Sequence, residues 1–198
     1  MTKLCSIIFP SRGRAEQCAY SVQSLLRAEP GMEDQFDILI RLDNDDPQKE
    51  RYLELLSAIS NVKLIFGERG KGYGDLWVYY DQLAKATDAK WLMQWNDDAH
   101  LFGPWISELK KVPDTGIWVQ CEIHHLGGST YPQDDGAPFV ILPNRFWEVI
   151  GADRIPHYTD TGSINALRAL GWKCHFLPGT SFHHERDSSD VLAEHRRL

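Results

Sequence analysis

The feature that most constrains the fold is an alternation, through the first hundred residues, of short apolar runs with amphipathic segments. Four runs have the length and composition of buried strands: Leu4–Phe9, Asp37–Leu42, Val62–Phe66 and Trp91–Trp95. The intervening segments repeat apolar residues at helical spacing: Cys18, Val22, Leu25 and Leu26; Tyr52, Leu55, Leu56 and Ile59; Leu76, Tyr79, Tyr80 and Leu83. This alternation predicts an α/β fold with a mostly parallel, Rossmann-like central sheet flanked by helices.

The second half of the chain is less regular. Strands are predicted over Ile117–Cys121, Pro138–Leu142 and Lys173–Phe176, and helices over Phe146–Ile150 and Ser163–Leu170. At the helix starts of the first half, Asp46 before Pro47 predicts an N-cap, and Asp75 predicts another.

Composition limits the class of protein. With 198 residues, 42% of them hydrophobic, the chain can bury one sizeable core, which predicts a single domain over residues 1–198. No apolar run is long enough for a signal peptide or a transmembrane segment, and a cytoplasmic location is expected. The four cysteines lack zinc-site spacing and are expected to be buried free thiols: Cys5, Cys18, Cys121 and Cys174. The net charge of −7 argues against nucleic-acid binding through a broad basic surface.

The strongest chemical signal follows the strand Trp91–Trp95, which runs directly into Asn96, Asp97 and Asp98. Adjacent carboxylates at a strand end lose hydration unless a cation or hydrogen bonds compensate, and their hard oxygens suit Mg²⁺ or Mn²⁺. The same residues are equally typical of a turn or helix N-cap, and this segment alone does not distinguish the two. Farther on, His183 or His184 could complete a metal site begun at Asp98, although paired histidines are usually polar surface.

Three more loops are expected at the same edge, because ligands of parallel α/β sheets bind beyond the carboxyl ends of the strands. In Pro10–Arg14, Arg12 and Arg14 suit phosphate or base contacts, or form a solvated basic loop. After the second strand, Asp43 and Asp45 could bind a base edge or ribose hydroxyls, or only belong to a helix start, which is the interpretation of Asp46. The loop Glu68–Gly74 matches neither the Walker nor the Rossmann pattern.

In this order, the segments resemble the GT-A glycosyltransferases, in particular the inverting family 2 group. Ile7–Arg14 resembles the opening strand with its P-T-x-N-R loop. Asp37–Asp46 resembles the second strand with its acidic end, Gly70–Gly72 the stretch before the third helix, and Trp95–Asp98 the DxD motif. Tyr158–Thr161, Gly171–Pro178 and Phe182-His183 resemble the E-D-x-D, G-x-x-x-x-x-P and final histidine motifs. The resemblance covers nearly the whole chain.

The resemblance implies a metal-dependent glycosyltransferase that moves a sugar from a nucleotide-sugar, with UDP-sugars favoured, to a hydroxyl acceptor. It implies Asp160 as the catalytic base and Asp98 and His183 as ligands of Mn²⁺ or Mg²⁺. The donor would bind at Pro10, Ser11, Arg12, Arg14, Asp43, Asp45, Lys71, Asn96 and Asp97. Residues 1–100 would form the nucleotide-sugar half and residues 101–198 the acceptor half, with Glu122 to Asp135 as an acceptor loop or lid. The acceptor could be a saccharide, a lipid, a protein or a modified DNA base. Transfer with retention of the anomeric configuration, rather than inversion, is also open.

The sequence departs from the family pattern at three of these points. Asn96 stands where the family has the first aspartate of the DxD motif. Asp43-Asn44 stands where the family has an acidic pair after the second strand, and Thr159-Asp160 where it has Glu-Asp before the final helix. Two other functions therefore stay open. A metal-dependent hydrolase could use His124-His125 and His183-His184-Glu185 with the aspartates, although H-E-x-x-H spacing is missing. A non-catalytic nucleotide- or sugar-binding module would bind the nucleotide without turnover.

Overall fold

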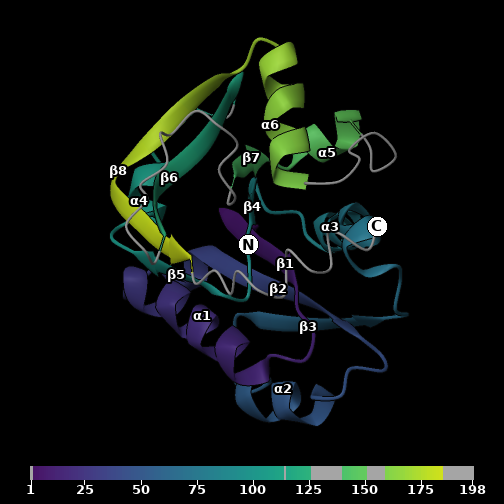
Figure 1. The fold of residues 1–198 in the computed structure, drawn as a ribbon. Helices are drawn as coiled ribbons and strands as arrows, with labels where there is room; N and C mark the ends of the chain where they lie inside the picture. The colour runs from purple at the N-terminus through teal and green to yellow at the C-terminus, as the bar shows by residue number, and fades with distance from the viewer. Residues whose placement is uncertain (1, 114, 126–139, 151–158, 185–198) are drawn as a thin grey trace.

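The computed structural model describes residues 2–113, 115–125, 140–150 and 159–184 (Figure 1). The strands are β1 (Cys5–Pro10), β2 (Phe36–Asp43), β3 (Val62–Gly67), β4 (Trp91–Gln94), β5 (Ala99–Phe102), β6 (Ile117–His125), β7 (Ile141–Pro143) and β8 (Lys173–His184). The helices are α1 (Ala15–Ala28), α2 (Lys49–Leu56), α3 (Leu76–Lys85), α4 (Ile106–Leu109), α5 (Arg145–Ile150) and α6 (Thr159–Ala169), with 3₁₀ turns at Glu33–Gln35 and Gly72–Asp75.

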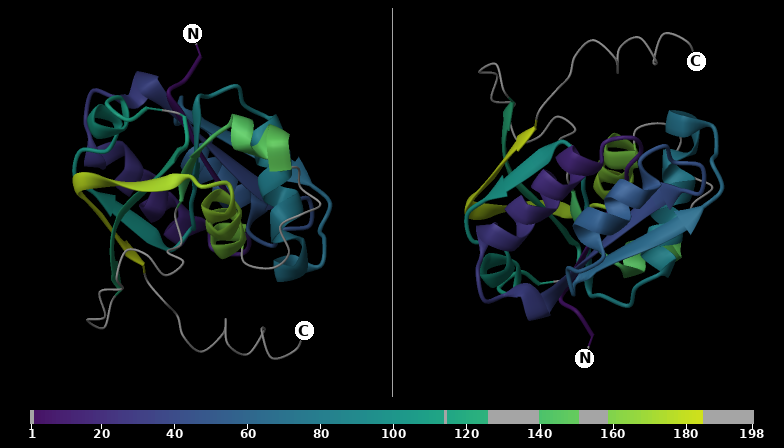
Figure 2. Two further views of the ribbon diagram at one scale, coloured as in Figure 1. Left: turned by 90° about the horizontal axis from the view of Figure 1, so that it is seen from above. Right: turned by 90° about the horizontal axis from the view of Figure 1, so that it is seen from below.

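The strands form one sheet in the order β3-β2-β1-β4-β7-β6-β8-β5. Strands β1 to β4 are mutually parallel, β7 is antiparallel to both of its neighbours, and β6 and β8 are parallel. Because β1 lies parallel to and between β2 and β4, the carboxyl ends of these three strands lie side by side at one edge, as the alternating pattern predicts. Figure 2 shows the molecule from its two ends, with α6 and β8 in front in one view and α2 and β3 in front in the other.

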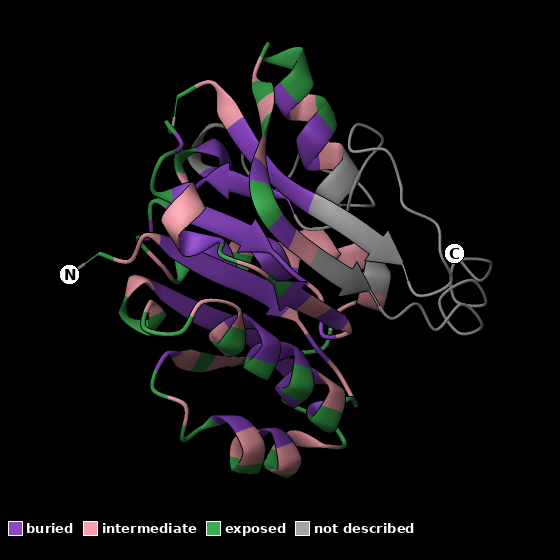
Figure 3. Ribbon diagram, turned by 90° about the vertical axis from the view of Figure 1, so that its left-hand side faces the viewer, coloured by how far each residue is buried: buried purple, intermediate pink, exposed green. Residues whose placement is uncertain are grey.

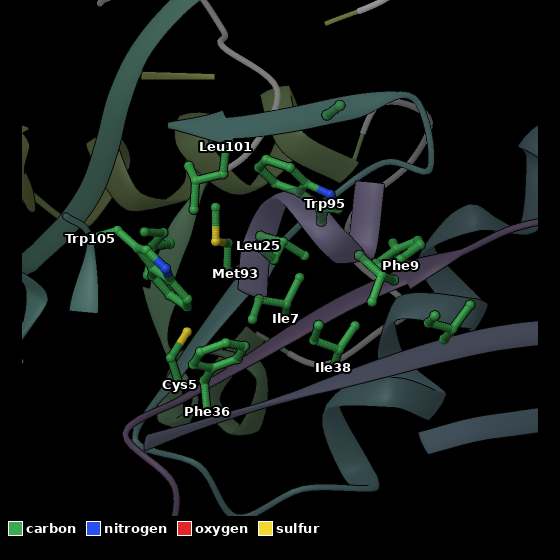
Figure 4. Close-up of a cluster of buried hydrophobic side chains, with 14 of the residues drawn as sticks. Cys5, Ile7, Phe9, Leu25, Phe36, Ile38, Met93, Trp95, Leu101 and Trp105 are labelled. Carbon is green, nitrogen blue, oxygen red and sulfur yellow. The ribbon is translucent and has the colours of Figure 1, made fainter. Parts of the chain in front are cut away.

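Two apolar cores lie on opposite faces of the sheet because strand side chains alternate. On one face Ile7, Ile38 and Met93 pack against α1, where Leu25 faces them in Figure 4. On the other face Ile8, Leu39 and Leu92 pack with side chains of α3, α5 and α6. Figure 3 shows the resulting buried strands between partly exposed helices. Both faces are covered, so the chain forms a layered α/β domain.

The sheet curls around α1. Strand β5 is last in the strand order, yet two serines of α1 bind its backbone. Ser21 Oγ donates to the Ala99 carbonyl at 2.7 Å, and Leu101 N–H donates to Ser24 Oγ at 3.0 Å. Burying these hydroxyls requires such partners, and here the partners link the far strand of the sheet to the first helix.

Several element boundaries differ from the sequence prediction. The bounds of the four strands of the first half agree with the prediction within one residue at each end. Where Pro138–Leu142 was predicted, the described residues form β7, Ile141–Pro143. Strand β8 was expected to end at Phe176 but extends to His184, and β5 was not predicted. Helix α6 begins before the predicted Ser163. Most of the Glu122 to Asp135 stretch, predicted as an acceptor loop or lid, lies outside the described residues.

One of the two predicted helix N-caps, Asp46, is wrong, and the other, Asp75, is confirmed in position but makes no side-chain cap hydrogen bond. Helix α2 begins at Lys49, so Gln48 is its N-cap residue, and Asp46 instead accepts hydrogen bonds from Gln48 N–H and Gly13 N–H. Asp75 is the N-cap residue of α3, but its carboxylate accepts from Lys71 N–H in the preceding loop. Both aspartates use their carboxylates to fix loops rather than helix starts.

The cysteine prediction is confirmed in part. All four thiols are free; Cys5, Cys18 and Cys121 are buried, whereas Cys174 is only half-buried. Among the residues that the structure describes, no helix combines the length and apolar character required to cross a bilayer.

Candidate functional site

The β1–α1 loop lies between the loops that follow β2 and β4 and contacts both. Arg12 Nη1 lies 2.8 Å from Asp43 Oδ2 and 2.7 Å from Asp45 Oδ1. Arg14 Nη1 lies 3.2 Å from Asp97 Oδ1 and 3.9 Å from Asp98 Oδ2. Gly13, between the two arginines, has a φ of +67°, a left-handed conformation that disfavours other residues. The loops predicted to meet do meet, and alternate arginines pair with two separate acidic turns.

The turn after β2 is built on a buried arginine. Arg41 is 2% exposed, donates to Asp43 Oδ1 and to the Glu68 carbonyl, and lies with its guanidinium carbon 4.5 Å from the centre of the Tyr79 ring. Gly67 packs closely beside it, because a Cβ there would lie 3.0 Å from Arg41 Nη2, a tighter contact than Cβ atoms usually make. With Arg12 on its other oxygen, Asp43 is a paired carboxylate, which is what a buried charge needs.

The turn after β4 is built on hydroxyl groups. Ser11 Oγ donates to Asp97 Oδ2 at 2.6 Å and lies 2.7 Å from the Tyr52 hydroxyl, which accepts from Arg14 N–H at 3.0 Å. Since Ser11 has one proton and gives it to the carboxylate, Tyr52 must donate to Ser11. The chain of hydrogen bonds therefore has one direction, from the Arg14 amide through Tyr52 and Ser11 to Asp97.

Burial dominates the protonation of Asp97. The residue is 8% exposed, and this desolvation raises its pKa to about 6, although Arg14 and the Ser11 hydrogen bond act in the opposite direction. By contrast, the hydrogen bond from Arg12 lowers the pKa of the exposed Asp45. The β4 turn thus carries a carboxylate that its present partners stabilise incompletely.

The backbone of the β4 turn is held from both faces of the sheet. Tyr80 of α3 donates to the Trp95 carbonyl at 2.8 Å, and Trp95 Nε1 donates to Ser21 Oγ of α1 at 2.7 Å. Ser21 Oγ also lies 3.2 Å from the Asn96 carbonyl. These contacts fix the backbone immediately before Asp97 and Asp98, and so the position from which their side chains extend.

The donor atoms of this turn fit a hard divalent cation, since Asp97 and Asp98 supply carboxylate oxygens at adjacent positions. Strand β8 supplies the neighbouring backbone, because Ala99 pairs with His184 and His100 with His183. The His183 side chain itself lies outside the described part. Among the side chains that are described, no three His, Cys, Asp or Glu residues cluster. The described side chains at this turn therefore supply two carboxylates, those of Asp97 and Asp98.

Asp160 lies in the first turn of α6, and its side chain is likewise outside the described part. The start of this helix is near the end of β4, because Gln94 Nε2 lies 3.4 Å from Ser163 Oγ. Ser163 is one helical turn after Asp160, so α6 brings its N-terminal turn to the edge where the arginine loop lies.

The remaining predicted residues differ in placement. Pro10 ends β1, and half-buried Asn96 begins the acidic turn. Lys71 is exposed, and its backbone N–H binds Asp75 in the loop before α3 rather than the acidic turns. A hollow of about 360 Å³ between Thr115, Arg145 and Trp172 lies at the amino ends of β6 and β8, away from this edge.

Sequence reasoning missed the residues that support the site. Arg41 was interpreted only as part of a strand, and Tyr52 and Tyr79 only as parts of apolar helix faces. Gly67 was given no role. Arg41 gives the one visible signal, since a charged residue between the apolar Ile40 and Leu42 of a buried strand needs a buried partner. The Tyr52 hydroxyl has no such signal, because its ring fits the helix face equally well.

Comparison with solved structures places this arrangement among known folds. The model superimposes on the crystal structure of S. aureus TarS 1–349 with UDP-GlcNAc at a TM-score of 0.75 and 12% identity, covering 98% of this chain and 61% of that chain. GalNAc-T7 with UDP, GalNAc and Mn²⁺ gives 0.70 and 12%, covering 93% and 44%. The chain has a GT-A-like fold.

The sequence itself carries no such match. No family model matches the chain, and no curated protein matches it. The chain also spans only 60% of TarS 1–349 in another crystal structure of that protein, which gives a TM-score of 0.71. At 12% identity the likeness concerns the fold, and the chemistry of this chain has to be argued from its own residues.

Proposed function

We propose that this chain is a metal-dependent glycosyltransferase that moves a sugar from a nucleotide-sugar donor, with UDP-sugars favoured, to a hydroxyl acceptor, with inversion as in family 2. One observation carries the proposal. An arginine loop at the carboxyl edge of a GT-A-like sheet lies between two acidic turns, pairing with Asp43 and Asp45 on one side and Asp97 and Asp98 on the other.

This pattern suits a nucleoside diphosphate, which is anionic at the diphosphate and offers hydrogen-bond donors on its base and ribose. Arg12 and Arg14 would contact phosphate oxygens, for which the guanidinium geometry is adapted. Asp43 and Asp45 would accept from the base or ribose. Uridine is favoured because TarS binds UDP-GlcNAc and GalNAc-T7 binds UDP in structures of this fold.

Asp98 and His183, with Asp97 beside them, would hold Mn²⁺ or Mg²⁺. When bound, the ion supplies positive charge that stabilises the leaving diphosphate. The GalNAc-T7 structure of this fold contains Mn²⁺. The register that pairs Ala99 with His184 supports the assignment, since it brings the end of β8 to the acidic turn.

Asp160 would act as the base that takes the proton of the acceptor hydroxyl as this attacks the anomeric carbon. The contact between Gln94 and Ser163 supports this role, because it holds the start of α6 beside the end of β4. The acceptor, whether saccharide, lipid, protein or modified DNA base, would reach the site from the side of residues 101–198.

The proposal is tested by thermal shift with a panel of nucleoside diphosphates, each with and without Mn²⁺. We expect UDP with Mn²⁺ to raise the melting temperature most, and Asp98→Ala to remove the part that depends on Mn²⁺. Asp88→Ala, an exposed aspartate between α3 and β4, is the matched control and should behave as wild type. If no nucleoside diphosphate shifts the melting temperature, the proposal is wrong; binding without turnover of any donor would instead identify a binding module.

A further inference from the structure

We propose that Arg14 is the counter-ion of the Asp97–Asp98 pair when no metal is bound. A divalent cation that binds to this pair displaces the Arg14 guanidinium, which then binds the diphosphate of the nucleotide. The inference rests on the proposed function and assigns this arginine a positional exchange in it. Arg14 Nη1 lies 3.2 Å from one carboxylate and 3.9 Å from the other, so its positive charge occupies the space between them.

The two parts of Arg14 are held differently. Its backbone is fixed by the hydrogen bond from its N–H to the Tyr52 hydroxyl, at 3.0 Å. Its side chain is 43% exposed, whereas the Asp97 and Asp98 side chains are 10% and 15% exposed. A long side chain that is anchored at its base and half in solvent can move its guanidinium without moving the loop.

Charge makes the exchange necessary. A divalent cation bound to both carboxylates would lie in the space that the guanidinium occupies, and two cations at one pair repel each other. The displaced guanidinium stays in the same loop, and its planar donors match the oxygens of a diphosphate. Asp97 is only 8% exposed, so its carboxylate needs a positive partner whichever ion supplies it.

Arg12 provides the contrast within the same loop. It lies 2.8 and 2.7 Å from Asp43 and Asp45, and Asp43 is also bound by Arg41. Both carboxylate oxygens of Asp43 are therefore paired with an arginine. Loss of Arg12 therefore removes one positive charge from the loop without freeing the Asp97–Asp98 pair.

The exchange predicts that cation and nucleotide bind cooperatively, because the diphosphate provides a new partner for the arginine that the cation releases. Without nucleotide, the cation must displace Arg14 into water. With nucleotide, the guanidinium exchanges one set of anionic oxygens for another. Arg14 should therefore carry part of the coupling between the two ligands, which by linkage is the same whichever ligand binds first.

The test is a titration of Mn²⁺, followed by the EPR signal of the free ion, with and without saturating UDP. In the absence of UDP, Arg14→Met should bind Mn²⁺ about three- to tenfold more tightly than wild type, because a half-exposed competing charge is removed. Arg14→Lys should stay near wild type, and Arg12→Met should change the affinity by less than about twofold. With UDP, the advantage of Arg14→Met should disappear, and its coupling between UDP and Mn²⁺ should be smaller than in wild type.

The proposal is overturned if folded Arg14→Met, checked by its melting curve, binds Mn²⁺ as wild type does or more weakly, or if Arg12→Met gains as much. Failure of the two proposals can be told apart by binding of UDP, measured separately by calorimetry. If UDP binds but Arg14→Met gains no affinity for Mn²⁺, only the exchange is wrong. If neither wild type nor variant binds UDP, the proposed function is wrong as well.

Discussion

The two acidic turns at the carboxyl edge of the sheet solve the same electrostatic problem differently. After β2, Asp43 is paired on both oxygens by Arg12 and the buried Arg41. After β4, Asp97 is bound by the Ser11 hydroxyl and the half-exposed Arg14, and its pKa is raised to about 6. In the first turn Asp43 is paired on both oxygens by the protein itself, whereas the second turn holds a buried carboxylate whose charge is offset only in part. Under the proposed function, the first turn would serve recognition and the second would bind the metal.

The largest expected effect concerns Asp160, the base of the proposed reaction, in α6 next to the β4 turn. Asp160→Asn should lower sugar transfer by about 10²- to 10⁴-fold, because the amide cannot take the acceptor proton, while UDP binding stays near wild type. The rate of sugar transfer to an acceptor that the wild-type protein uses, and calorimetry with UDP, measure the two quantities. Asp88→Asn is the control. A variant that transfers sugar at the wild-type rate would remove Asp160 as the base.

The second prediction tests whether the β2 turn depends on its buried arginine. Arg41→Met should lower the free energy of unfolding by about 3 kcal/mol, because it removes a buried partner of Asp43 and the cation over the Tyr79 ring. Urea denaturation measures the change. Arg51→Met, on the surface of α2, removes exposed ion pairs and should have little effect. Equal effects of the two variants would contradict the assigned role of burial.

The third prediction tests the charge of the β4 turn through pH, in protein free of metal. Because the folded pKa of Asp97 is raised from 3.8 to about 6, the folded state binds the proton more tightly than the unfolded state. The stability from this group is complete below pH 4 and is lost as pH rises through 6, by about 2–3 kcal/mol. The unfolding free energy of Asp97→Asn should therefore rise relative to wild type between pH 4 and 7. A constant difference would show that the carboxylate is well stabilised.

The smallest expected effect concerns the hydroxyl chain. Tyr52→Phe should lower the free energy of unfolding by about 1–2 kcal/mol, since Arg14 N–H loses its acceptor and Ser11 loses a donor. Urea denaturation again measures it. Tyr20→Phe is matched, because Tyr20 is 63% exposed on α1, and should cause no measurable change. If both variants behave alike, Tyr52 contributes only its buried ring.

The sequence predicted the first half of the fold almost completely. Strands β1 to β4 and helices α1 to α3 each have a continuous apolar pattern, and such patterns are local. The prediction for β8 ended early because Pro178-Gly179 is typical of a turn. In the structure the pairing of β6 with β8 passes from Gln120–Phe176 to Glu122–Ser181, so an irregularity absorbs these residues and the strand continues.

Strand β5 illustrates why the rest could not be predicted. Ala99–Phe102 is short and directly follows the acidic turn, so no pattern distinguishes it from a loop. It becomes a strand by pairing with β8, eighty residues farther along the chain, and by accepting contacts from α1. The N-cap prediction for Asp46 was wrong for the same reason, since its carboxylate binds Gly13 of a distant loop.

The sequence alone determined that the chain forms a layered α/β domain and which loops meet at one edge, because spacing and the direction of parallel strands are sufficient for both. It also identified Arg12, Arg14, Asp43 and Asp97 as residues of that edge. Only the tertiary structure decided which arginine pairs with which carboxylate and which of them is buried. Pairing and burial depend on groups that are far apart in sequence, such as Tyr52 beside Ser11 or Tyr79 over Arg41, and no local pattern records those distances.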